Sequence, residues 1–144
     1  NAKGFRLPTN NEWELAARYI NDINGDGDIL DPGEYYPGDH ISGDTTETFE
    51  FSSVLGNYAW YFDNSINATH IVGDKTTNAL GLYDISGNVS EWVFDWYYLF
   101  IGTKRVCRGG SYGNIAVVLR IGNVRYNNPY DKAVDLGFRF ARNP

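Results

Sequence analysis

The stretch Gly81–Trp92 constrains the fold of this chain more than any other part of its sequence. Large apolar and aromatic residues surround one small polar turn, Ser86-Gly87-Asn88, and Glu91 follows three residues after that turn. Glycine and asparagine tolerate the left-handed backbone conformations that tight turns require. The sequence therefore predicts a rigid polar turn enclosed by the apolar core.

The side chain of Glu91 is expected to be partly buried, because apolar and aromatic residues bracket it. A buried carboxylate requires a partner, which is either a cation or a set of N–H donors. Calcium is one candidate, since turn carbonyls and Glu91 would supply the hard oxygen ligands that this ion prefers. The alternative is that Asn88 and Glu91 form hydrogen bonds only with nearby backbone groups.

Composition and charge narrow the classes of protein to which the chain can belong. It has 144 residues, enough for one domain with one core, and its 42% apolar and 21% charged residues indicate a globular protein. The net charge of −6, without a dense basic stripe, argues against a nucleic-acid partner. No apolar run approaches the roughly 20 residues of a membrane span. Cys107 is the only cysteine, which excludes an intrachain disulfide.

The start of a helix is predicted near the beginning of the chain. Thr9 is a candidate N-cap, and Glu12 stands three residues later, which makes a capping box. Apolar residues then recur at helical spacing, namely Trp13, Ala16, Ala17 and Ile20. We expect a helix over about 10–20 that packs on a sheet through this face.

The segment that follows resembles the first half of an EF-hand calcium loop. Oxygen-bearing side chains stand at alternate positions, namely Asp22, Asn24, Asp26 and Asp28. Gly27 occupies the sixth position, where such loops turn sharply, but the twelfth position is Gly33 and Glu34 comes one residue late. We expect calcium here; the alternative is an acidic loop that binds no ion.

The remaining segments predict loops and short strands. Residues 35–56 are expected to form a long acidic surface loop. Residues 105–108 alternate like a strand, and Gly109-Gly110-Ser111 requires a tight or bulged connection. Residues 116–125 and 136–140 predict further short strands, with a polar loop over 126–135 between them.

Several motifs follow one another along nearly the whole chain: Gly4–Thr9 with Glu12–Arg18, Tyr58–Tyr61, Asn78–Trp92, Arg108–Ser111 and Leu136–Arg139. Together they resemble the formylglycine-generating enzyme (sulfatase-modifying factor) family. The resemblance implies an α+β fold of the C-type-lectin-like type, with little regular secondary structure and a small mixed sheet. Family domains open with strands and a helix before the Arg-Leu-Pro-Thr motif. We therefore expect residues 1–144 to be the C-terminal portion of one such domain, with an upstream segment of the same protein as a possible partner.

The resemblance also implies that the chain holds a structural calcium ion and that it lacks the copper(I) site of the family enzymes. In family members the Gly-Asn-Val-x-Glu-Trp turn holds a structural calcium ion through carbonyls and the glutamate, which implies ligands at Ser86, Gly87, Val89 and Glu91. Family enzymes hold copper(I) with two cysteines after the Gly-Gly-Ser motif and oxidise a substrate thiol. The matching positions are Asn114 and Leu119, which do not bind copper(I). The resemblance thus implies a non-catalytic member without copper; the alternative is an oxidoreductase that acts on a protein cysteine.

Some bacterial family members are variable proteins of diversity-generating retroelements, in which the segment after Arg-Gly-Gly-Ser changes on a fixed scaffold. This chain fits that plan, since residues of unlike chemistry stand between Arg108–Ser111 and Leu136–Arg139. Aromatic and small polar residues are typical of adaptable binding surfaces. We expect a binding surface at Tyr112, Asn114, Ile115, Val117, Val118, Asn123, Val124, Tyr126, Asn128, Tyr130 and Asp131, with Ala133 and Val134 beside them.

The partner expected for this surface is a protein or another surface ligand, and the expected location is extracellular or on a bacterial cell surface. One alternative is that these residues form the ordinary strands and loop of a generic family member. Another is a purely structural domain of a larger protein.

Overall fold

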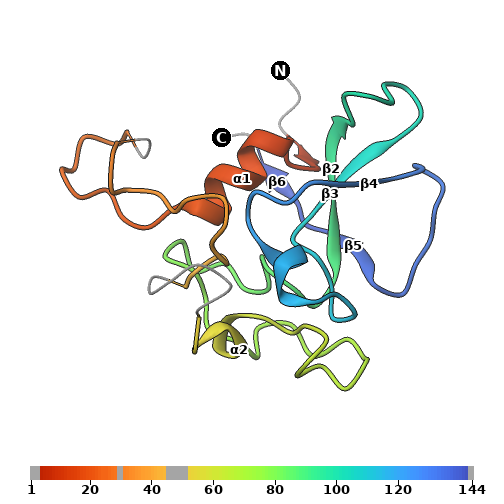
Figure 1. The fold of residues 1–144 in the computed structure, drawn as a ribbon. Helices are drawn as coiled ribbons and strands as arrows, with labels where there is room; N and C mark the ends of the chain where they lie inside the picture. Colours follow the sequence, from red (N-terminus) through yellow and green to blue (C-terminus); the bar gives the residue numbers. More distant parts are fainter. Residues whose placement is uncertain (1–3, 29–30, 45–51, 143–144) are drawn as a thin grey trace.

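The computed structural model describes residues 4–28, 31–44 and 52–142. Its elements, in chain order, are β1 (Phe5–Arg6), α1 (Asn10–Arg18), α2 (Leu55–Tyr58), β2 (Ser90–Trp96), β3 (Arg105–Arg108), the 3-10 helix η1 (Ala116–Leu119), β4 (Arg125–Asn127), β5 (Leu136–Phe138) and β6 (Ala141–Arg142). Long irregular segments connect these short elements (Figure 1). The expected α+β fold with little regular secondary structure is confirmed.

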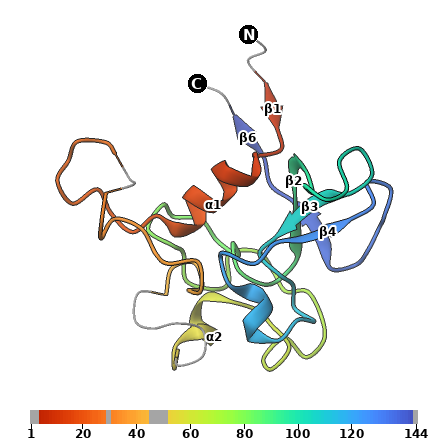
Figure 2. The ribbon, with the colours of Figure 1, turned by 45° about the horizontal axis from the view of Figure 1, so that its top comes forward.

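A mixed sheet of four strands, in the order β4-β3-β2-β5, forms the centre of the fold. Strands β2 and β3 are antiparallel neighbours, and β3 pairs antiparallel with β4. Strand β5 pairs parallel with β2, so that Ser90 lies opposite Leu136. A separate antiparallel pair joins β1 to β6, and Figure 2 shows these two strands side by side near the ends of the chain.

Helix α1 begins where the capping box predicts. The Thr9 hydroxyl accepts a hydrogen bond from the N–H of Glu12, and the Glu12 carboxylate accepts one from the N–H of Thr9. The helix ends at Arg18, two residues earlier than expected, because Tyr19 adopts an extended backbone and forms an isolated bridge with Tyr35. Its buried face packs against β2 and β3, where Trp13 and Ala17 join Val93 and Val106 in the main core.

The prediction of a surface loop over 35–56 is wrong for most of its described part. Tyr36, Ile41 and Asp44 are buried, and Ile41 packs with Leu55, Ala59 and Leu119 in a second apolar cluster. Among the described residues of this segment, Tyr36, Ile41 and Leu55 enter the interior together with polar Ser42 and Asp44, which the loop prediction did not allow for. Residues 45–51 of the predicted loop lie outside the described residues.

Two of the strand predictions need correction. Residues 116–125 do not form a strand: η1 covers 116–119, a turn follows, and β4 begins only at Arg125. The reason is that Leu119 enters the second cluster while Ile121 enters the main core, which a straight strand does not allow. Strand β5 ends at Phe138, two residues before the predicted end. The central strand β2 was not predicted, because its first residues, Ser90 and Glu91, were interpreted as part of the polar turn.

Candidate functional site

The polar turn at 86–88 is buried, as predicted. Gly87 and Asn88 have φ values of 85° and 58°, so both lie in the left-handed region. A Cβ atom on Gly87 would meet the Trp60 carbonyl oxygen at 2.3 Å, which excludes any larger residue. The N–H of Asn88 donates to that same carbonyl oxygen at 2.9 Å, and the Asn88 side chain accepts from the N–H of His70 at 3.0 Å. The turn therefore fastens the 60–70 segment to the sheet.

The partner of the buried Glu91 carboxylate is provided by two distant side chains. Arg139 donates to it from Nε and Nη2, each at 2.6 Å, and Trp13 donates from Nε1 at 2.7 Å. These residues do not fit a calcium site that uses Glu91, because the guanidinium already contacts both carboxylate oxygens and would repel a second cation. Calcium held by the carbonyls of Ser86, Gly87 and Val89 stays a prediction.

A small pocket opens on the face of the sheet opposite α1. Successive strand residues face opposite sides, so Val106 faces the core while Cys107 faces the other way. The register places Arg125 opposite Cys107, with Asn127 two residues further on the same face. The pocket has a volume of about 160 Å³ and is lined by Ser90, Cys107, Arg125, Asn127, Ala133, Asp135 and Leu136.

The prediction of the binding surface missed Arg125, Asn127 and Asp135 in this pocket. Arg125 and Asn127 stand on either side of the predicted Tyr126, and only the strand register shows that they face the pocket. Asp135 accepts a hydrogen bond from the Ser111 hydroxyl at 3.0 Å, and its carbonyl accepts one from the N–H of Ser90 at 2.8 Å. The pocket thus combines a guanidinium, a carboxylate and an amide, a set that can bind a polar ligand.

The thiol of Cys107 lies at the inner wall of this pocket and is unreactive. Only 1% of the residue is exposed, and this burial raises the pKa of the thiol to about 12. The Asn127 side-chain amide lies 3.7 Å from Sγ. Since the thiolate is the form that attacks electrophiles and binds metals, Cys107 remains an inert thiol at neutral pH.

Asn114 and Leu119, the positions expected from the resemblance to match the catalytic cysteines, take part in hydrogen bonding and in core packing. The Asn114 side-chain oxygen accepts hydrogen bonds from the N–H of Ser111 and from Arg125 Nη1, both at 2.9 Å. Leu119 is fully buried in the second apolar cluster with Ile41 and Leu55. In the described part of the chain, no three His, Cys, Asp or Glu side chains gather as a metal-binding group.

The structure divides the predicted binding residues into an exposed and a supporting group. The exposed group comprises Ile115, Val124, Tyr126, Asn128, Tyr130 and Asp131. The partly buried group comprises Tyr112, Asn114, Val117, Val118 and Asn123. In the second group Val118 packs against the second cluster, and Asn123 donates to the Val118 carbonyl at 2.8 Å. These two residues stabilise the turn after η1 rather than present a contact surface.

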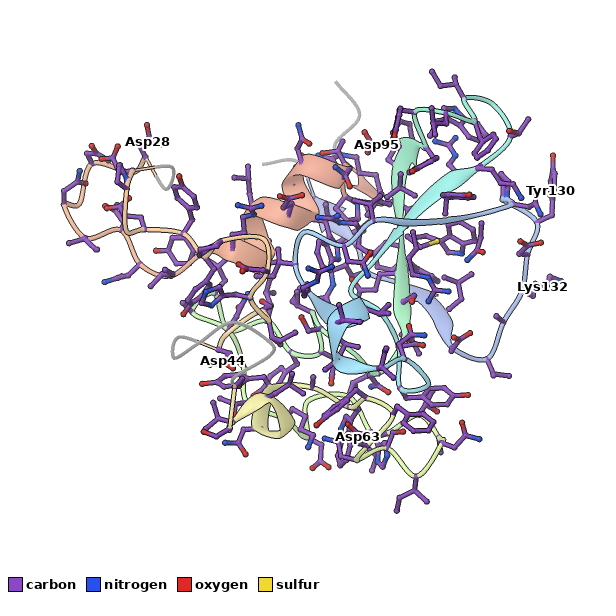
Figure 3. The ribbon with its side chains drawn as sticks, viewed as in Figure 1. Asp28, Asp44, Asp63, Asp95, Tyr130 and Lys132 are labelled. Carbon is purple, nitrogen blue, oxygen red and sulfur yellow. The ribbon has the colours of Figure 1, made fainter. Side chains whose placement is uncertain are left out.

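An aromatic patch on the β2–β3 hairpin tip continues the exposed group. The ring of Tyr126 lies 4.3 Å from that of Tyr97 and 5.3 Å from that of Phe100, between centroids. Beside them, Tyr98, Leu99 and Ile101 are exposed. Tyr130, 91% exposed, projects from the loop between β4 and β5 at the outer edge of the molecule (Figure 3). The binding surface predicted from the sequence did not include this hairpin patch.

Comparison with known proteins gives the family of the chain. The sulfatase-modifying factor enzyme 1-like domain matches residues 1–144. This chain belongs to that family. The structure of Treponema denticola variable protein 1 is 39% identical and superposes with a TM-score of 0.76, covering 100% of this chain and 49% of the variable protein.

Two curated proteins are also similar in sequence to this chain. The inactive C-alpha-formylglycine-generating enzyme 2 of Bos taurus is 32% identical over 149 residues, which is 96% of this chain and 44% of the relative. The chaperone protein LppX of Paenibacillus barcinonensis is 32% identical over 118 residues, which is 77% of this chain and 39% of the relative. The chain therefore spans half or less of the length of these three relatives.

The family resemblance inferred from the motifs is confirmed by these matches. Relatives of this sulfatase-modifying factor-like domain include an inactive member and a variable protein, which agrees with a non-catalytic binding module at the level of the family. Among the described residues, neither helix is long and apolar enough to cross a membrane.

Proposed function

We propose that this sulfatase-modifying factor-like domain binds a protein or another surface ligand, without catalysis, through the face formed by β4 and the loop 128–134. The observation that carries this proposal is the pocket beside β4. It presents the guanidinium of Arg125, the amide of Asn127 and the carboxylate of Asp135, while the thiol next to them is buried and protonated. A site built in this way can recognise polar groups, and its thiol is not a nucleophile at neutral pH.

The exposed surface at the edge of the sheet favours a protein ligand. Tyr126 lies opposite Val106 and so faces the α1 side of the sheet, where it joins the hairpin patch, while Tyr130 projects from the loop after β4. Tyrosine and arginine dominate the binding energy of many protein interfaces, because they combine a large rigid surface with polar groups. Exposed aromatic side chains near a small polar pocket therefore suit a protein partner that contacts this edge of the sheet.

The proposal further holds that the exposed residues differ among sister proteins on one scaffold, as in a variable protein at a bacterial surface. The match to Treponema denticola variable protein 1 supports this view. Sister sequences from one genome test it. Substitutions should concentrate at the exposed group that includes Ile115, Tyr126 and Tyr130, and should spare Gly87, Glu91 and Arg108. Substitutions spread evenly over the chain would contradict it.

The binding face is tested with a panel of purified extracellular proteins. For any protein that binds the wild-type chain, we measure affinity for Arg125→Ala, Tyr126→Ala and Tyr130→Ala. At least two of these variants should lose about tenfold or more, the loss that marks an interface hot spot. Tyr35→Ala is the matched control, because Tyr35 has an exposure similar to that of Tyr126 but lies at the far end of α1. Equal affinities for all four variants would refute the proposed face.

The absence of catalysis is tested separately. With Asn114 and Leu119 in place of cysteines, we expect no oxidation of a thiol peptide when the chain is loaded with copper(I). Cys107 should resist alkylation by iodoacetamide in the folded chain and react readily in urea, because unfolding returns its pKa from about 12 towards its ordinary range. Turnover of the thiol peptide, or rapid alkylation of the folded chain, would contradict the proposal.

A further inference from the structure

The described parts of an acidic loop, residues 20–28 and 31–34, project from the end of α1, away from the rest of the fold (Figure 1). Backbone hydrogen bonds close its base. The N–H of Ile20 donates to the Glu34 carbonyl at 3.0 Å, and the N–H of Tyr36 donates to the Arg18 carbonyl at 2.9 Å. The loop is therefore a closed unit attached to the helix, whose two ends are held in a fixed relation.

Side-chain oxygens within the loop are turned towards its own backbone. The Asp22 carboxylate accepts from the N–H of Gly25 at 2.6 Å and from the N–H of Gly27 at 3.0 Å. The Asn24 side-chain oxygen accepts from the N–H of Asp26 at 3.0 Å. Gly25 and Gly27 have φ values of 76° and 83°, which allow these tight turns. Figure 3 labels Asp28 on this loop, on the side of the molecule away from the sheet.

Glu34 provides an independent sign of a missing partner. Its side chain is buried, with 2% of the residue exposed, although it follows an exposed acidic loop. One oxygen, Oε1, accepts from the N–H of Ile23 at 2.7 Å and from that of Asn24 at 3.4 Å, so the carboxylate is directed into the start of the loop. The other oxygen, Oε2, is buried and has no hydrogen-bond partner in the described part of the chain. A buried carboxylate oxygen without a donor is unfavourable unless a cation faces it.

We propose that this loop binds one calcium ion, with Glu34 as the ligand that closes the site. In this proposal Asp22, Asn24 and Asp26 supply side-chain oxygens, and Glu34, whose Oε1 accepts from the N–H of Ile23 at the start of the loop, offers its unpartnered Oε2 as a further ligand. An EF-hand places its closing glutamate at the twelfth position, on a helix. In this chain Tyr35, directly after the loop, does not begin a helix; instead it pairs with Tyr19 in an antiparallel bridge. This pairing places Glu34, the thirteenth residue of the loop, where it can act as the closing glutamate.

The charge of the loop favours a divalent cation. Between residues 20 and 35 the sequence holds five carboxyl side chains and no lysine or arginine: Asp22, Asp26, Asp28, Asp31 and Glu34. Amide and carboxylate oxygens are ligands that calcium accepts at flexible geometry, whereas transition metals prefer imidazole or thiolate. In the described residues the carboxylates of Asp22, Asp26 and Glu34 are not yet gathered into a metal-binding group, so on this proposal the ion draws them together, with Asn24 and main-chain carbonyls completing the site.

This site is independent of the proposed binding face. The loop lies on the opposite side of the molecule from β4 in both Figure 1 and Figure 2. Calcium binding here would stabilise the loop and the end of α1, and it would leave ligand binding at β4 unchanged. Loss of one function therefore does not imply loss of the other.

The test uses the whole chain and the metal alone. Calcium is titrated into the calcium-free chain by calorimetry, and terbium(III) luminescence sensitised by tyrosine reports the loop directly, because the Tyr19 hydroxyl contacts the N–H of Asp22. We expect one ion per chain at the loop and a melting temperature that rises with calcium. Glu34→Gln and Asp26→Asn should each weaken binding at least about tenfold, the size of effect seen when metal-site residues are changed.

Asp63→Asn serves as the control, because it removes one exposed carboxylate outside the loop and should bind calcium as the wild type does. Asp26 is exposed, so Asp26→Asn carries the test even if Glu34→Gln does not fold. The proposal is overturned if the wild type shows no terbium luminescence and no calcium uptake at about 10 mM, above the weakest EF-hand range. It is also overturned if Asp26→Asn binds calcium as tightly as the control.

Discussion

The Glu91–Arg139 pair allows a sharp test of how a distant side chain stabilises the central turn. Substituting Arg139→Met keeps the aliphatic stem but removes the guanidinium. Glu91, with a side chain 6% exposed, would then keep only the donor from Trp13. Removing one partner of a buried ion pair typically costs about 3–5 kcal/mol. At roughly 3 °C per kcal/mol for a chain of this length, the melting temperature should fall by about 10–15 °C.

The chain contains a matched control for this substitution. Arg6 and Glu12 also form a bidentate pair, through Nη1 and Nη2 of the arginine at 2.7 Å each, but their side chains are 33% and 45% exposed. Exposed pairs contribute about 0–1 kcal/mol, because water solvates each charge when its partner is removed. Arg6→Met should therefore lower the melting temperature by no more than about 3 °C.

The assay is thermal and urea unfolding of both single variants, repeated with calcium and with EDTA. The double variant Glu91→Gln with Arg139→Met should be more stable than Arg139→Met alone, because it no longer holds an uncompensated buried charge. Equal losses for Arg139→Met and Arg6→Met would refute the reasoning that burial determines the effect. Recovery of Arg139→Met by calcium would show that a cation can replace the guanidinium at Glu91.

Two further predictions concern pH and backbone geometry. The hydrogen bond from Arg6, followed by that from the Thr9 N–H, lowers the pKa of Glu12 to about 2. The ionised Glu12 carboxylate contributes fully to stability above the unfolded-state pKa near 4.5, and this contribution is lost as pH falls towards 2. Between pH 4.5 and 2 the free energy of unfolding, measured in urea, should therefore fall less for Glu12→Gln than for the wild type. Gly87→Ala should destabilise the chain by more than about 2 kcal/mol, because the new Cβ meets Trp60 and the φ is positive. Gly113→Ala, with open space around it, should change the urea midpoint little; equal midpoint shifts would contradict the strain argument.

Features with a local cause could be predicted from the sequence. The start of α1 depends on Thr9 and Glu12, three residues apart, and the capping box was found where expected. The turn at Gly87-Asn88 was predicted because few residues adopt its backbone conformation. The family also followed from the order of its motifs, and the match over residues 1–144 confirms it.

Features that depend on distant contacts could not be predicted. The partner of Glu91 stands 48 residues further along the chain, and nothing near Glu91 indicates an arginine there. The pocket residues Arg125 and Asn127 become neighbours of Cys107 only through the register between β3 and β4. Residues 116–125 have an apolar pattern that suits a strand, but the two separate cores draw Leu119 and Ile121 in different directions.

Substitutions on the two sides of the four-stranded sheet should have different effects. Its α1 side carries Trp13, Val93 and Val106, where a substitution changes the free energy of unfolding. Its other side ends at the edge strand β4 and the exposed loop that bears Tyr130, where most substitutions change stability by less than about 0.5 kcal/mol. On the proposed binding function, substitutions at this edge would alter what the domain recognises while its folding stays the same, so new specificities would arise there with little loss of stability.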